Sequence, residues 1–157
     1  MKVVINRCYG GFGLSKEAVK RMAELQGRPC YLFTQEFSDR SAELGRYVPT
    51  SHSKKELLWH AFDVPNPNDV LAQSKPWHEM NLDERHAHNE LYVQRSVDSK
   101  PGNRSDPLLI RVVEELGKKA NGHCAALAII EIPDGIEYDV EEYDGLEWVA
   151  EKHRTWR

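Results

Sequence analysis

The chain has 157 residues, of which 40% are hydrophobic and 29% are charged, and its formal net charge is −4 at pH 7. This length and composition predict a single globular domain (residues 1–157) with a hydrophobic core, and they exclude an intrinsically disordered chain. The acidic balance makes duplex nucleic acid an unlikely partner, because proteins that bind it usually present a basic surface.

Three cysteines, Cys8, Cys30 and Cys124, are widely spaced, and each lies in or beside an apolar run. They predict free thiols that pack as small hydrophobes, because no closely spaced pair indicates a zinc knuckle or a thioredoxin-like motif. Such cysteines are typical of a reducing compartment. The sequence opens on a strand-like run and contains no apolar stretch of membrane-spanning length. We therefore expect a cytoplasmic protein with no signal peptide and no membrane partner.

The first part of the sequence predicts a strand, a turn, a helix and a second strand. Residues 2–5 (K-V-V-I) form a β-branched run, and the glycine-rich turn Y-G-G-F-G follows at residues 9–13. Ser15 is the expected N-cap of a helix that stops near Gly27. Residues 30–33 (C-Y-L-F) predict the second strand.

From about residue 35 to residue 103 the pattern loosens, and we interpret this segment as an insertion with one or two short helices. A capping box, S-K-K-E at residues 53–56, predicts a helix that continues through Phe62. Prolines then break the chain repeatedly, and residues 91–93 (L-Y-V) return to strand-like character.

The last third carries the clearest signals. Asp106 followed by Pro107 predicts the start of a helix, and the N-G pair at residues 121–122 predicts its end. A strand over residues 128–132 and a half-buried strand from residue 136 follow. The D-G pair at residues 144–145 predicts a two-residue hairpin turn. The arm after this turn fits either a strand or a helix, and we favour the strand.

This order of elements predicts an α+β fold. Two strand–helix–strand units favour a ferredoxin-like β-α-β-β-α-β sandwich, with helices on one face of a largely antiparallel sheet. The expected additions are the central insertion and an extra C-terminal β-hairpin.

The first candidate site is the turn between the first strand and its helix. Glycines let main-chain N–H groups approach a ligand, and a helix N-terminus favours negative charge. The turn therefore predicts an anion or phosphate site, although its spacing matches neither the dinucleotide nor the P-loop fingerprint. The simpler interpretation is a structural connection that packs Phe12 against the sheet. The predicted ligand-binding residues are Cys8, Tyr9, Gly10, Gly11, Gly13 and Ser15.

The second candidate is the C-terminal segment. If the two-residue turn forms, Glu142 faces Glu147, and facing carboxylates need a cation, a proton or a basic group to relieve them. Glu147 and Glu151 are possible acid–base residues, and with His153 they form a possible metal-ligand set. A solvated hairpin end is the simpler interpretation. If the arm packs near the turn, His153 and Arg154 are expected to bind the same anion.

The third candidate is a histidine group in the insertion, His78, His86 and His88. Histidines two positions apart point to one side on a strand, as metal ligands require, but to different sides on a helix. Surface histidines on a polar segment are the simpler interpretation, so we assign no metal site.

Four motifs resemble those of a family of uncharacterised small proteins encoded by tailed phages and prophages. They are N-R-C-Y-G-G-F-G-L-S at residues 6–15, R-S-D-P-L-L at 104–109, V-V-E-E-L-G at 112–117, and E-E-Y-D-G with E-K-H-R-T-W between 141 and 156. The resemblance covers about the first quarter and the last third of the chain. It implies a phage product in the cytoplasm of the infected bacterium, and it carries no established activity.

The leading hypothesis is a cytoplasmic binding protein that holds a small anionic, nucleotide-like ligand or a host bacterial protein, plausibly in counter-defence. One alternative is a small metal-assisted hydrolase that uses Glu147, Glu151 and His153 or the histidines of the insertion. Another is a protein–protein inhibitor that acts through the central insertion. The sequence identifies no cofactor and no oligomeric state.

Overall fold

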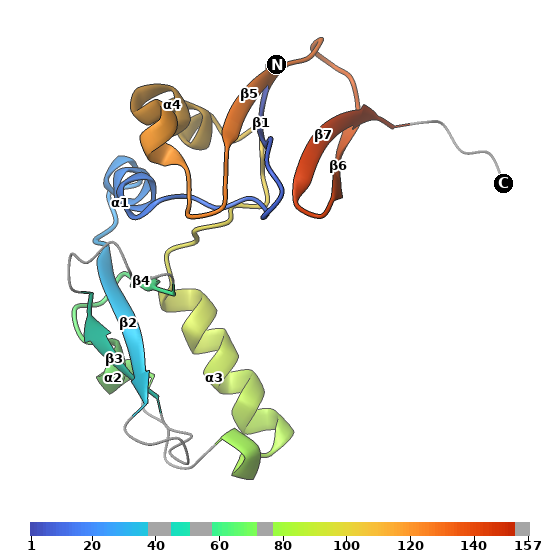
Figure 1. The fold of residues 1–157 in the computed structure, drawn as a ribbon. Coiled ribbons are helices and arrows are strands. Elements are labelled where there is room, and N and C mark those ends of the chain that lie inside the picture. The colour runs from blue at the N-terminus through green and yellow to red at the C-terminus, as the bar shows by residue number, and fades with distance from the viewer. Residues whose placement is uncertain (38–44, 51–57, 72–76, 153–157) are drawn as a thin grey trace, which may run out of the picture. The chain divides into compact units, whose positions relative to one another are not determined.

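The computed structural model describes residues 1–37, 45–50, 58–71 and 77–152 of the chain. The protein is a mixed α+β structure, as the sequence predicts, and it divides into two compact units (Figure 1). Unit 1 comprises residues 1–26 together with the chain from residue 99 onward, and unit 2 comprises residues 27–98. The central segment therefore starts earlier than expected and includes the second predicted strand.

Unit 1 is built on a two-stranded antiparallel sheet. Strand β1 (Lys2–Asn6) pairs with β5 (Leu127–Glu131), and helix α4 (Pro107–Leu116) packs against both strands and against helix α1 (Lys16–Leu25). Most of the fully buried core side chains come from β1, α1 and α4, because both helices present one apolar face. They include Val3, Val4, Val19, Leu109 and Val112.

Both helix starts in unit 1 are confirmed. The Ser15 hydroxyl accepts a hydrogen bond from the N–H of Ala18 (3.1 Å), and the Asp106 carboxylate accepts one from the N–H of Leu108 (2.7 Å). Helix α4 ends earlier than predicted, and the 3-10 helix η2 (Gly117–Ala120) continues the chain to the N-G pair. Local capping chemistry thus places α1 and α4.

The C-terminal hairpin is also confirmed. Strands β6 (Tyr138–Tyr143) and β7 (Leu146–Glu151) pair through the expected two-residue turn, whose residues Asp144 and Gly145 both have positive φ. The arm after the turn is a strand, and β7 lies beside β1 (Figure 1).

Unit 2 contains a three-stranded antiparallel sheet. Strand β2 (Tyr31–Phe37) pairs with β3 (Gly45–Pro49) on one side and with β4 (His60–Phe62) on the other. Helix α2 (Pro67–Val70), the 3-10 helix η1 (Trp77–Glu79) and helix α3 (Leu82–Arg95) complete the unit. Its small core consists of Phe33, Phe62 and Leu71, with Tyr47 and Tyr92 packed against it.

The ferredoxin-like topology is not confirmed. The described strands form three separate sheets, ordered β1-β5, β3-β2-β4 and β6-β7. β1 and β2 therefore do not share a sheet, because β2 takes both of its partners, β3 and β4, from the segment that the sequence predicts to be an insertion. β1 instead pairs with a strand more than 120 residues away in the sequence.

Two predictions inside the central segment are wrong. Phe62 was expected in a helix but lies in β4, while the capping box at residues 53–56 falls outside the described residues. Residues 91–93 were expected to be strand-like but lie in α3. That helix begins at a capping box in which Asn81 and Glu84 exchange side-chain bonds to each other's N–H groups (2.8 and 2.9 Å). This cap outweighs the β propensity of one short apolar run.

Unit 2 should lose stability as the solution becomes acidic. The Nδ1 atom of His60 lies 2.8 Å from the Tyr92 hydroxyl, and burial lowers the pKa of His60. The unfolded chain, in which this pKa is about 6.5, therefore takes up the proton first, and folding stability falls as the pH drops below that value. We expect urea titrations to give a smaller free energy of unfolding at about pH 5.5 than at about pH 7.5.

The variant His60→Gln should show a shallower loss of stability over the same pH range. Burial also lowers the pKa of His88. The variant His88→Gln therefore measures how much this second half-buried histidine contributes to the same loss of stability. An unchanged pH dependence in His60→Gln would contradict the assignment to His60.

Candidate functional site

The glycine-rich turn is tied down by the protein's own carbonyl groups. The N–H of Gly10 donates to the carbonyl of Asp144 (3.3 Å), and the N–H of Ser15 donates to the carbonyl of Ala120 (2.9 Å). The N–H of Leu14 likewise donates to Ser99 (3.0 Å). The prediction that Gly10 and Ser15 present bare main-chain donors to an anion is therefore wrong.

The hairpin tip covers another part of the same turn. A Cβ atom placed on Gly145 would lie 2.2 Å from the nitrogen of Gly11 and 2.8 Å from that of Gly10. Only a residue without a side chain permits this approach of two backbones. The close packing supports the structural interpretation of the turn.

The remaining predicted residues of the turn lie around this contact. Tyr9 is exposed, and Gly13 uses its carbonyl to accept a bond from the N–H of Gly122 (2.8 Å). Cys8 is half-buried, and its thiol donates to the carbonyl of Cys124 (3.0 Å).

The C-terminal candidates are separated by the structure. The predicted register is confirmed, because Glu142 faces Glu147 and Glu151 faces Tyr138. Glu147 is buried whereas Glu151 is exposed. Glu147 and Glu151 are four residues apart on β7, which separates them by about 13 Å. This distance is too great for the two carboxylates to share a proton directly. His153 and Arg154 fall outside the described residues.

Glu147 is the centre of a buried polar network. One carboxylate oxygen accepts a bond from the N–H of Asn6 (2.7 Å), and the other accepts a bond from the Arg104 guanidinium (2.9 Å). The side chains of Arg104 and Glu147 are only 16% and 8% exposed. The guanidinium also lies 3.2 Å above the ring centre of Phe12. Arg104 supplies the cation that the facing carboxylates were expected to need.

Asn6 extends this network to three segments. Its side-chain amide donates to the carbonyls of Gly145 and Cys8 (2.6 Å each) and accepts a bond from the N–H of Ala126 (2.7 Å). Sequence reasoning missed both Asn6 and Arg104. For Asn6, the available signal was its place at the end of a buried β-branched run, where a side-chain amide must find hydrogen-bond partners.

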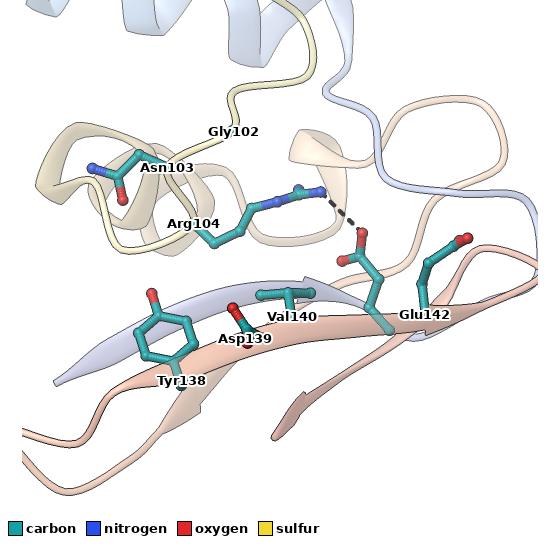
Figure 2. A pocket seen from close by; sticks show the side chains of 8 residues that line it. Gly102, Asn103, Arg104, Tyr138, Asp139, Val140 and Glu142 are labelled. Carbon is teal, nitrogen blue, oxygen red and sulfur yellow. Dashed lines mark hydrogen bonds and ion pairs between the residues drawn. The ribbon is translucent and has the colours of Figure 1, made fainter. Parts of the chain in front are cut away.

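A polar cavity of about 500 Å³ lies beside this network. Figure 2 shows the Arg104 side chain extended toward the hairpin, with Tyr138, Asp139, Val140 and Glu142 along β6. The lining includes three carboxylates, those of Asp139, Glu142 and Glu147. The cavity therefore offers hydrogen bonding and negative charge, which does not suit an anion.

A second cavity, of about 560 Å³, has mostly apolar walls. The β1–β5 sheet and strand β7 supply the apolar lining, and Arg7 and Glu147 are its two charged residues. Glu147 is already paired with Arg104, whereas Arg7 is exposed and forms no ion pair with any of the residues that the structure describes. The apolar lining residues are Ile5, Ile130, Ile132, Leu146, Trp148 and Val149.

The histidines of the insertion do not form a metal site. His86 and His88 lie on α3, so their rings point to different sides of the helix, and His88 packs against the Trp77 ring. In the part of the chain that the structure describes, no three His, Cys, Asp or Glu side chains are grouped to hold a metal ion. Nor does any described helix have the length and apolar character needed to cross a membrane.

The apolar cavity with its single cation is thus the most ligand-like feature of the described residues, since small-molecule sites are usually concave and apolar with a few polar groups. Its volume also lies in the ordinary range for such sites. Comparison of the chain with models of known families gives no match, and comparisons with curated proteins and with solved structures give none either.

Proposed function

We propose that this is a binding protein whose unit 1 holds an anionic ligand with an apolar body. The observation that carries the proposal is the cavity between the β1–β5 sheet and β7, whose lining combines apolar side chains with the cationic residue Arg7. We place the anion in this cavity rather than at the glycine-rich turn, because the N–H groups of Gly10, Leu14 and Ser15 already donate to carbonyls of the protein.

The two parts of such a ligand would be recognised by different chemistry. Arg7 presents several N–H donors in a planar fork, which matches a carboxylate or a phosphate group. The isoleucine side chains and Trp148 offer apolar and aromatic surface to the body of the ligand. A nucleotide fits this description if its base lies on Trp148 and its phosphate reaches Arg7.

The negative charge of Glu147 does not oppose this assignment. Its carboxylate accepts bonds from Asn6 and Arg104, so the Arg104 cation already balances its charge. The resemblance of the terminal motifs to phage proteins supports a role in the host cytoplasm, such as counter-defence. A segment of a host bacterial protein that combines an acidic residue with apolar neighbours offers the same chemistry to this cavity.

Calorimetric titration of the full chain tests the proposal with four probes: AMP, cyclic AMP, indole-3-acetate and decanoate. We expect at least one probe to bind, and Arg7→Gln to weaken that binding about 10-fold, the value of one lost charge-assisted hydrogen bond. Lys20→Gln is the matched control, because Lys20 is an exposed cation on α1 that does not line the cavity.

Two results would oppose the proposal. One is the absence of binding by all four probes. The other is equal affinity of the wild-type protein and Arg7→Gln, which would place the ligand elsewhere. Binding of the nucleotides without the two organic acids would favour the nucleotide-like ligand, and the reverse would favour a simpler amphipathic acid.

A further inference from the structure

Two of the three cysteines meet in unit 1. Cys8 follows β1 and Cys124 precedes β5, and 116 positions separate them in the sequence. The Cys8 thiol nevertheless lies 3.0 Å from the main-chain carbonyl oxygen of Cys124. Cys8 is half-buried and Cys124 is exposed, so the expectation that every cysteine packs as a buried hydrophobe is wrong for Cys124.

The backbones of the two cysteines approach each other just beyond the paired strands β1 and β5. The N–H of Arg7 donates to the carbonyl of Ala126 (2.8 Å), which continues the β1–β5 register by one pair and leaves Cys8 opposite Ala125, the neighbour of Cys124. Disulfides join Cα atoms roughly 4.4–6.8 Å apart, and the hydrogen bond from the Cys8 thiol to the main chain of Cys124 is consistent with a separation near this range. The turn also runs directly past the second cysteine, since a Cβ atom on Gly10 would lie 2.6 Å from that of Cys124.

We propose that Cys8 and Cys124 are a redox-modification site that a low-molecular-weight disulfide, such as oxidised glutathione, converts into a protein disulfide. Cys124 reacts first because it is the more exposed thiol. Its thiolate attacks one sulfur of the oxidised glutathione, which forms a mixed disulfide and releases one glutathione thiolate.

The second step closes the bond within the protein. The Cys8 thiolate attacks the sulfur of Cys124 in the mixed disulfide and releases the second glutathione. The two cysteines together lose two electrons and two protons, and the two reduced glutathione molecules carry them away. In a reducing compartment the reverse exchange restores both thiols.

The bond would fix the turn that supports the hairpin tip. Gly10, two residues after Cys8, donates to the carbonyl of Asp144 at that tip, and Gly145 packs on the same turn. Oxidation therefore ties the segments on which the hairpin rests to each other. This inference does not depend on a ligand in the apolar cavity.

The test incubates the full-length native protein with oxidised glutathione and then counts free thiols after acid quenching and denaturation. We expect the three thiols of the reduced chain to fall to one, with an intact mass lower by two hydrogen atoms and a peptide map that joins Cys8 to Cys124. The oxidised protein should also melt at a higher temperature than the reduced protein, because the cross-link restricts the unfolded chain.

Single serine variants provide the controls. Cys30→Ser should form the same disulfide, because Cys30 lies in unit 2. Cys124→Ser should not form it, and Cys8→Ser should stop at the glutathione adduct of Cys124. Circular dichroism checks that each variant is folded. A wild-type protein that keeps three free thiols, retains glutathione on Cys124 or links Cys30 would overturn the proposal.

Discussion

Replacing Gly145 with alanine should destabilise unit 1 far more than the same change at Gly135. Both glycines have similar positive φ values, +83° and +81°, so the strain of placing an L residue in that conformation is alike at the two sites. At Gly135 the added Cβ meets nothing within 4 Å, whereas at Gly145 it lies 2.2 Å from the main-chain nitrogen of Gly11.

The expected cost is about 1 kcal/mol for Gly135→Ala, from backbone strain alone. For Gly145→Ala the hairpin tip must also move away from a backbone that cannot yield, and the total rises to about 3 kcal/mol or more. Urea denaturation followed by circular dichroism measures both variants. Equal losses in the two variants would mean that the hairpin tip does not rest on the turn.

The ends of the chain were predictable because their signals are local. The caps at Ser15 and Asp106 and the D-G turn each act within a few residues, and each gives the expected element. The turn also fixes the hairpin register, because a two-residue loop leaves one pairing for the strands.

The fold of the centre and the pairing of β1 were not predictable in the same way. β1 joins β5 across most of the chain, and β2 takes its partners from segments with weak patterns, including the three-residue strand β4. Strand pairing depends on which edges meet in space, and periodicity does not encode that choice. Helix α3 is longer than the short helices expected in this segment, and it includes residues 91–93, which the sequence predicts as strand-like.

The candidate site shows the same contrast between local signals, which the sequence carries, and long-range contacts, which it does not. The sequence indicates that Gly10 and Ser15 lie at a strand–helix junction, but it does not reveal that the acceptors for their N–H groups lie more than 100 residues away. The same holds for Glu147, whose partner Asn6 is 141 positions distant. A pattern locates donors, and only the tertiary structure shows whether they are already used.

The second large effect is expected at Glu147. Glu147→Gln removes the carboxylate charge that Glu147 places beside the buried Arg104 guanidinium, and breaking a buried ion pair in this way costs roughly 3–5 kcal/mol. The exposed pair Lys152–Asp139 (3.2 Å) lies on the same hairpin, with side chains 51% and 58% exposed. Asp139→Asn is therefore the matched control, with an expected cost below about 1 kcal/mol because solvent screens the pair.

A double-mutant cycle separates the charge pair from the packing of its members. Arg104→Met removes the cation but keeps an apolar chain near Phe12, and combined with Glu147→Gln it should cost clearly less than the sum of the two single changes. Urea denaturation gives the coupling energy, and hydrogen exchange at β1 reports whether the N–H of Asn6 loses protection. Additive losses, or a Glu147→Gln variant as stable as Asp139→Asn, would show that the hairpin is held to β1 by apolar packing rather than by this network. The result also bears on the apolar cavity, because Glu147 sits between β7 and the sheet that form its walls, so a loosened hairpin would change the volume available to a ligand.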